Sequence, residues 1–182
     1  MRGRTRRICY CALFCALIIL STLLFRFTIP GTDVIVTLQV FFVLLCGQLM
    51  PVRYCLYTTA AYLLAGLIGL PVFSAVNGPA VIVTPSFGYL LAFPAAACVC
   101  SHVRQRTRKG SRYLASFSGV VVLYMIAGAY VALLSKVYLK NSLSAGSILI
   151  SYVAIFLPLD LLKAFFAAWL GRHLVRSGFG KL

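Results

Sequence analysis

The sequence is poor in charged residues and has almost no acidic ones. Charged side chains make up 10% of its 182 residues, whereas soluble globular domains carry roughly a quarter. Hydrophobic residues reach 62%, so the composition excludes a soluble fold. Apolar runs of about 18 residues or more, long enough to cross a bilayer, follow one another along nearly the whole chain. One polytopic, all-α membrane domain covering residues 1–182 is therefore predicted.

Several signatures of catalysis are also missing. The chain has no phosphate-binding P-loop, no His-Glu-x-x-His metal motif and no nucleophile elbow. Its seven cysteines lack the usual spacing of a zinc site and lie in or beside apolar runs, where free cysteine packs as a small hydrophobe. His102 and His173 fall at predicted helix ends among basic residues. We therefore predict no enzyme, metal or cofactor. If the protein transports a solute uphill, the energy must come from an ion gradient or another polypeptide.

The apolar runs predict six transmembrane spans. Their approximate bounds are 8–25, 34–50, 52–70, 84–103, 113–139 and 145–171. A tight turn joins the second and third spans at Pro51, because proline cannot continue a helix without losing a backbone donor.

The basic residues report the orientation of these spans. There are 17 of them against two acids, and nearly all of them gather in the short polar breaks and at the termini instead of on one face of a soluble element. This pattern favours membrane topology over nucleic-acid binding. With the N-terminus inside, the cytoplasmic set is Arg2, Arg4, Arg6, Arg7, Arg53, Arg104, Arg106, Arg108, Lys109, Arg112, Arg172, Arg176 and Lys181. The external set is Arg26, Lys136 and Lys140, so both termini are predicted to be cytoplasmic, in a multi-pass protein of the cell membrane.

Asp160 and Lys163 lie inside the last predicted span. Each charge near the bilayer centre costs roughly 2.5–3.5 kcal/mol, so two of them need a partner or a polar cavity. On a helix they differ by about 60° around the axis and about 4.5 Å along it, and thus share a face. The pair either neutralises itself or forms an internal polar site. The second interpretation is favoured because no other acid lies in any span and because Pro158 frees a backbone carbonyl nearby.

Other polar side chains and two external segments add weaker signals. The polar candidates are Gln39, Asn77, Ser86, Tyr89 and Tyr152, any of which could simply hydrogen-bond between helices. The segments 26–33 and 71–85 are rich in turn formers and are interpreted either as plain connections or as a lid. Ala12 and Ala16 have the small-xxx-small spacing that lets helices approach closely, although two further alanine pairs share it.

Three stretches of the chain resemble the BioY family, the biotin-specific substrate-binding (S) components of energy-coupling factor (ECF) transporters. They are TLQ at 37–39, the run from YLLAGLIGLPVF at 62–73 through Asn77 and Gly78 to PSFGYLLAF at 85–93, and FLPLDLLKA at 156–164. Two departures stand out: Phe87-Gly88 replaces the family's Gly-Gly, and a glycine-rich external loop is reduced to Asn77-Gly78.

The resemblance implies a six-helix subunit that captures biotin from outside. It also implies a transmembrane coupling protein and a pair of cytosolic ATPases as partners, which agrees with the missing P-loop. In such S components an Ala-xxx-Ala pattern in the first helix contacts the coupling protein, so Ala12 and Ala16 are the predicted contact residues.

The resemblance also suggests roles in binding biotin. Asp160 is suited to accept from the ring N–H groups of the ureido moiety, and Asn77 or Gln39 could donate to its oxygen. Lys163 could oppose the valerate carboxylate or donate to the ureido carbonyl. The apolar parts of the ligand would pack on aromatic side chains, namely Tyr89, Phe73 and Tyr152.

The alternative hypothesis is an ion-coupled secondary carrier of a small anionic metabolite, with Asp160 and Lys163 as its relay. Such a carrier would need no ATPase partner, and its uptake would collapse with the ion gradient. An intramembrane enzyme is a third hypothesis, but it would need a nucleophile or a metal set that the sequence does not show.

Overall fold

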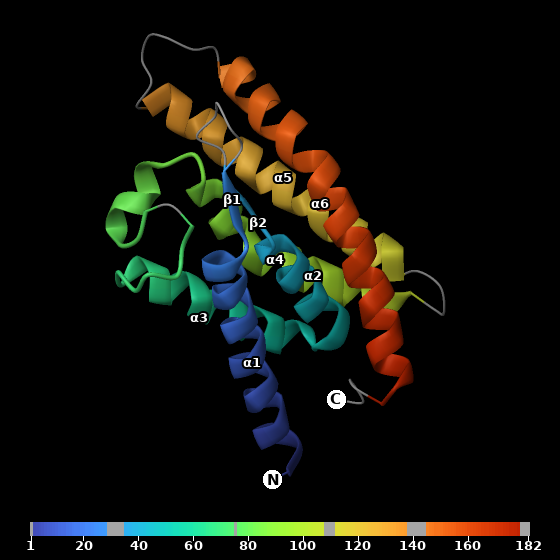
Figure 1. Ribbon diagram of the computed structural model, residues 1–182. Coiled ribbons are helices and arrows are strands. Elements are labelled where there is room, and N and C mark those ends of the chain that lie inside the picture. The colour runs from blue at the N-terminus through green and yellow to red at the C-terminus, as the bar shows by residue number, and fades with distance from the viewer. Residues whose placement is uncertain (1, 29–34, 75, 108–111, 138–144, 179–182) are drawn as a thin grey trace.

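The computed structural model describes most of the chain as helix (Figure 1). The described residues are 2–28, 35–74, 76–107, 112–137 and 145–178, with side chains at 5–26, 36–74, 76–107, 112–135 and 156–178. Within them the α-helices are α1 (Arg2–Leu24), α2 (Gln39–Leu49), α3 (Val52–Leu67), α4 (Phe87–Arg106), α5 (Arg112–Val137) and α6 (Ala145–Arg176). A short 3-10 helix, η1 (Pro79–Val83), lies between α3 and α4. The predicted all-α fold of six helices is confirmed.

The six helices differ in how fully they can span a membrane. Within the part of the chain that the structure describes with side chains, three stretches are long and apolar enough: Thr5–Leu24 in α1, Phe87–Arg106 in α4 and Arg112–Ser135 in α5. Helix α2 has only 11 residues, which at about 1.5 Å per residue covers roughly half of a hydrocarbon core about 30 Å thick. Helix α3 has 16 residues and α6 has 32.

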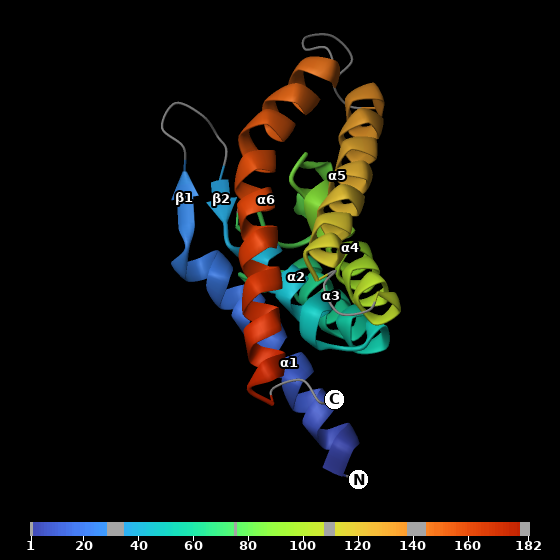
Figure 2. The ribbon, with the colours of Figure 1, turned by 90° about the vertical axis from the view of Figure 1, so that its right-hand side faces the viewer.

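A short β-ribbon takes up the start of the span predicted at 34–50. Strand β1 (Arg26–Thr28) pairs antiparallel with β2 (Ile35–Thr37), and Arg26 lies opposite Thr37. The residues of β2 are all β-branched, a composition that favours strand over helix. Helix α2 therefore begins only at Gln39. Figure 2 shows β1 and β2 toward the end of the molecule that is opposite the N-terminus of α1.

Helix α2 lies in the middle of the bundle and packs against α4 and α6 (Figure 1). Nine of its 11 residues are buried, as expected for a helix that is apolar all round. Glycines allow its close approach to neighbours. A Cβ on Gly47 would lie 2.8 Å from the Ala97 carbonyl oxygen and 2.8 Å from Cys100 Cβ. Packing between small residues replaces the hydrophobic driving force that lipid cannot supply.

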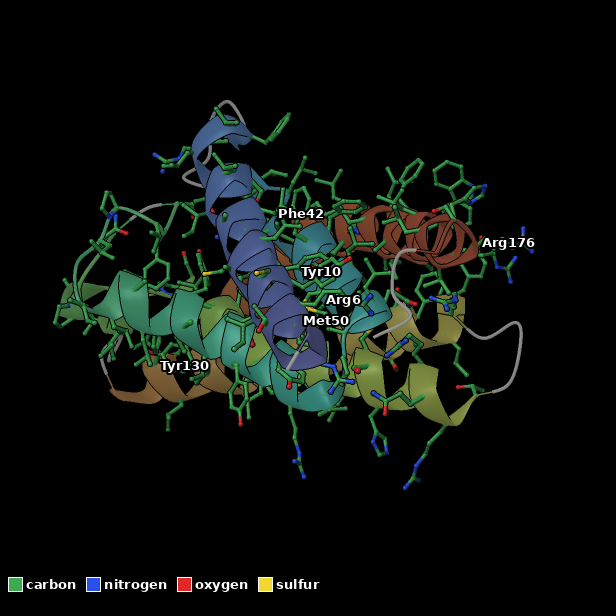
Figure 3. The ribbon with its side chains drawn as sticks, turned by 90° about the horizontal axis from the view of Figure 1, so that it is seen from below. Arg6, Tyr10, Phe42, Met50, Tyr130 and Arg176 are labelled. Atoms are coloured by element: carbon green, nitrogen blue, oxygen red, sulfur yellow. The ribbon has the colours of Figure 1, made fainter. Side chains whose placement is uncertain are left out.

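The turn between α2 and α3 lies where Pro51 predicted it. Helix α2 ends at Leu49 and α3 begins at Val52. The carbonyl oxygen of Met50 accepts from the Ser101 hydroxyl at 2.6 Å and from the Arg104 guanidinium at 3.2 Å, so α4 holds the turn. Figure 3 looks at this end of the molecule, where α1 crosses over α2 and α3. The N-terminal end of α1 and the C-terminal end of α6 both lie here (Figure 1).

Gly47→Ala tests the close packing of α2 on α4. The added methyl group would meet a backbone oxygen, which cannot move aside cheaply. Overpacking of this kind costs about 1–3 kcal/mol, and we expect a lower melting temperature in detergent. Ala129→Val, which adds bulk on an exposed position of α5, is the control and should melt like the parent. Equal melting of both variants would contradict the packing.

Candidate functional site: a buried ion pair in the last helix

Asp160 and Lys163 form a buried ion pair near the midpoint of α6. The Lys163 ammonium donates to Asp160 Oδ1 at 2.8 Å. The two residues are 2% and 8% exposed, so both charged groups are buried within the helix bundle. The predicted shared face of the helix is confirmed, and a direct partner for each charge explains how the pair is tolerated among apolar residues.

Tyr124 of α5 completes the polar centre. Its hydroxyl donates to Asp160 Oδ2 at 2.8 Å, so each carboxylate oxygen has a donor. Tyr124 was not among the residues predicted from the sequence. A usable signal existed, because Tyr124 lies well inside an apolar run, away from the span ends where tyrosines usually serve as interfacial anchors.

Aromatic rings from α4 and α6 surround this centre. The Tyr89 ring of α4 stands edge-on to the Tyr124 ring, with centroids 5.7 Å apart. It also contacts the Phe156 ring of α6, again at 5.7 Å. Of the predicted binding residues, Tyr89, Asp160 and Lys163 are thus brought together. Helices α5 and α6, which supply the ion pair and Tyr124, pack against each other (Figure 2).

Gln39 belongs to a different cluster, at the start of α2. Its side-chain amide donates to the Tyr62 hydroxyl of α3, and its amide oxygen accepts from the Thr37 hydroxyl at 2.9 Å. The Tyr62 hydroxyl donates in turn to the Val72 carbonyl at 3.1 Å. Gln39 therefore connects the β-ribbon, α3 and the connection that follows α3.

Phe73 and Asn77 hold that connection against α3. The Asn77 amide oxygen accepts from the backbone N–H groups of Val72 and Phe73, at 3.0 and 2.8 Å. Phe73 is 2% exposed and its ring lies over Gly66, where a Cβ would come within 2.0 Å of it. Arg26 of the ribbon donates to the Phe73 carbonyl at 3.4 Å. Phe73 is thus a core residue, and Asn77 has its amide nitrogen left to donate elsewhere.

The remaining candidates lie elsewhere. Tyr152 falls in α6, but its side chain lies outside the described residues. Ala12 and Ala16 are both exposed on α1. Ala12 lines a groove of about 820 Å³ between α1 and α3, together with Arg7, Ile8, Cys11, Cys15, Pro51, Arg53, Tyr54, Tyr57, Thr58 and Ala61.

The polar centre offers binding chemistry in an apolar surround. Lys163 keeps further N–H donors besides the one given to Asp160, and the carboxylate oxygens keep lone pairs for a second donor each. A small molecule with adjacent N–H donors and a carbonyl would match this arrangement. Among the described residues, His, Cys, Asp and Glu side chains form no group of three that could hold a metal ion.

Comparison with known proteins agrees with the predicted resemblance. The BioY family model matches residues 1–178. The chain belongs to the BioY family.

Individual relatives support this assignment. The chain is 32% identical to the biotin transporter BioY of Thermotoga maritima over 171 residues, which cover 93% of this chain and 95% of that protein. It is 33% identical to a probable biotin transporter BioY of Lysinibacillus sphaericus over 115 residues, 62% of this chain and 59% of that protein. With the biotin transporter BioY of Rhizobium etli it shares 30% over 179 residues, 92% of each chain.

A solved structure shows the same fold. The crystal structure of the S-component for biotin from an ECF-type ABC transporter superposes with a TM-score of 0.82 over 99% of this chain and 96% of that one, at 24% sequence identity. This chain and that S-component therefore share one arrangement of helices, which includes the short α2 and the long α6.

Proposed function

We propose that this chain is the biotin-binding S component of an ECF-type uptake transporter in the cell membrane. The observation that carries the proposal is the buried Asp160 carboxylate, held by Lys163 and Tyr124, in the last helix of a BioY-family chain. The names of the similar proteins supply the substrate, biotin. The chemistry of the polar centre agrees with it, because a ureido ring presents two N–H donors beside one carbonyl oxygen.

Three residues of the polar centre are proposed to contact the ligand. Asp160 accepts from the ureido N–H groups, Lys163 donates to the ureido carbonyl or to the valerate carboxylate, and Tyr89 packs on the apolar rings. Tyr124 orients the Asp160 carboxylate from the opposite side. This role explains why a phenol is tolerated inside an apolar helix.

The other predicted residues are proposed to shape the outer part of the site. Asn77 donates to the ligand through its amide nitrogen, since its oxygen is occupied by the backbone. Gln39 and Phe73 keep the connection after α3 in place, and through it Asn77. Tyr152 is proposed as a further aromatic wall, two helical turns before Asp160 on α6.

Delivery inward is proposed to depend on a transmembrane coupling protein and two cytosolic ATPases. Both chain ends are proposed to be cytoplasmic, which agrees with the shared location of the start of α1 and the end of α6 (Figure 1). The exposed Ala12 and Ala16 are proposed to contact the coupling protein. The groove beside Ala12 would admit part of a helix from that protein.

The ligand proposal predicts selective binding by the purified protein. We expect biotin to bind measurably in isothermal titration calorimetry, with riboflavin and thiamine weaker by about a hundredfold or more, because a site built for one set of hydrogen bonds leaves buried groups unpaired with another. Riboflavin or thiamine binding as tightly as biotin would contradict the proposal.

Asp160→Asn tests the direct role of the carboxylate. The variant keeps the shape but replaces an acceptor oxygen by a donor and removes the charge. A hydrogen bond to a charged group is worth roughly 1.5–3 kcal/mol, so the Kd for biotin should rise by about tenfold to a hundredfold or more. The control is the double variant Asp160→Asn with Lys163→Met, in which no charge is left unpaired. If the double variant recovers near-parental affinity, Asp160 serves only to neutralise Lys163.

Ala12→Trp tests the contact with the coupling protein. A large side chain in the groove should block assembly, so we expect biotin uptake by cells to be lost while biotin binding in detergent is unchanged. The matched control is Ala129→Trp on an exposed position of α5, which should preserve uptake. Loss of binding together with uptake would place Ala12 in the internal packing instead.

A further inference from the structure

Two arginines meet at the end of the molecule where α5 begins and α6 ends. The Arg112 guanidinium donates to the Gln48 carbonyl at 3.4 Å, to the Gln48 side-chain oxygen at 3.5 Å and to the Gly171 carbonyl at 3.3 Å. The Arg172 guanidinium lies over the Tyr113 ring, with its carbon 5.6 Å from the centroid. These long hydrogen bonds and a cation–π contact hold the two cations in place without neutralising them.

No carboxylate among the described residues balances these charges. The described acid is Asp160, which is committed to Lys163 and Tyr124. It precedes Arg172 by twelve residues of α6, about 18 Å at about 1.5 Å per residue. Arg112 donates to the carbonyl of Gly171, the residue before Arg172, and Arg172 lies over the ring of Tyr113, the residue after Arg112, so the two positive charges lie close together and repel each other. Bringing an anion to this place would relieve that repulsion.

An apolar surface continues from the arginines along α6. Phe165, Phe166 and Trp169 are 45%, 48% and 45% exposed. The Phe165 ring stacks on Tyr113 at 5.3 Å, and Arg172 lies over the same Tyr113 ring. Phe165, Trp169 and Arg172 follow the spacing that places them on one face of the helix. A cationic end and an aromatic stripe therefore form one continuous strip.

We propose that this edge of α5 and α6 binds an anionic phospholipid. Its phosphate would lie between Arg112 and Arg172, since guanidinium groups match phosphate oxygens in charge and geometry. Its acyl chains would run along Phe165, Phe166 and Trp169. A free phosphate ion would bind the arginines but would not contact the aromatic side chains. A lipid contacts both, through its phosphate and its acyl chains.

The experiment uses Trp169, the sole tryptophan of the chain, as its reporter. The full-length protein is placed in nanodiscs with increasing fractions of phosphatidylglycerol or phosphatidylcholine that carry brominated acyl chains, which quench tryptophan fluorescence on contact. We expect the quenching curves to give about a tenfold preference for the anionic lipid. In the Arg112→Gln, Arg172→Gln double variant, the preference should fall to about twofold or less.

The matched control removes the same charge elsewhere. The control double variant Arg53→Gln, Arg106→Gln alters two exposed arginines, one in the first turn of α3 and one at the end of α4. The lipid preference of this variant should equal that of the parent. Arg176, at the end of α6 (Figure 3), is left unchanged in all variants. If the Arg112→Gln, Arg172→Gln double variant melts early, the single variant Arg172→Gln is used instead. Arg172 contacts the Tyr113 ring, whereas Arg112 also holds Gln48 and Gly171 through hydrogen bonds.

Three results would overturn the proposal. The first is equal quenching by the two brominated lipids in the parent protein. The second is an equal loss of preference in the control, which would mean that general surface charge attracts the lipid. The third is relief of quenching by millimolar glycerol phosphate, which would mean that the arginines take a soluble anion without the chains.

Discussion

The ion pair of Asp160 and Lys163 constrains the helices around it. Removing one partner would leave an unpaired charge in an apolar helix, and breaking a buried pair in this way costs about 3–5 kcal/mol. The carboxylate also needs its second donor, Tyr124 of α5, so α5 and α6 have to keep their relative position. Tyr89 of α4 contacts Tyr124, which brings a third helix to the same place.

Close packing of small residues makes that arrangement possible. Gly119 of α5 lies against α2 and α4, where a Cβ would come within 2.6 Å of Leu44 and 3.1 Å of the Ala96 carbonyl oxygen. A Cβ on Gly88 of α4 would come within 2.9 Å of Tyr130 Cβ on α5. Lipid tails are as apolar as the side chains they touch, so close packing and interhelical hydrogen bonds supply the specificity that hydrophobic burial supplies in water.

The two ends of the bundle use polar groups differently. Near the ribbon, Gln39 and Tyr62 form a chain of hydrogen bonds that ends on the Val72 carbonyl. This chain of hydrogen bonds fixes the connection after α3 against α2 and α3. At the other end, Gln48 donates to the Arg112 carbonyl at 2.7 Å and to the Ser116 hydroxyl at 2.9 Å. The first network thus orders the end of the bundle that carries the β-ribbon, and the second orders the end where α5 begins and α6 ends.

Composition and spacing were sufficient to predict much of this protein. The lack of charge predicted a membrane bundle, Pro51 predicted the turn between α2 and α3, and the spacing of Asp160 and Lys163 predicted a shared helix face. These are local properties, since a proline or an i, i+3 pair acts within one turn of its own helix. The resemblance to the BioY family likewise followed from contiguous stretches of sequence.

Tertiary structure decided which polar residues meet. Tyr124 reaches Asp160 across 36 positions of sequence, whereas Gln39, predicted as a ligand, reaches Tyr62 and forms another cluster. Phe73 is buried under α3 because Gly66 leaves room for its ring. No pattern within one helix reports the rotation of that helix against its neighbours. That rotation is set by the packing of side chains from several helices together, and it determines whether a polar residue faces a ligand or another helix.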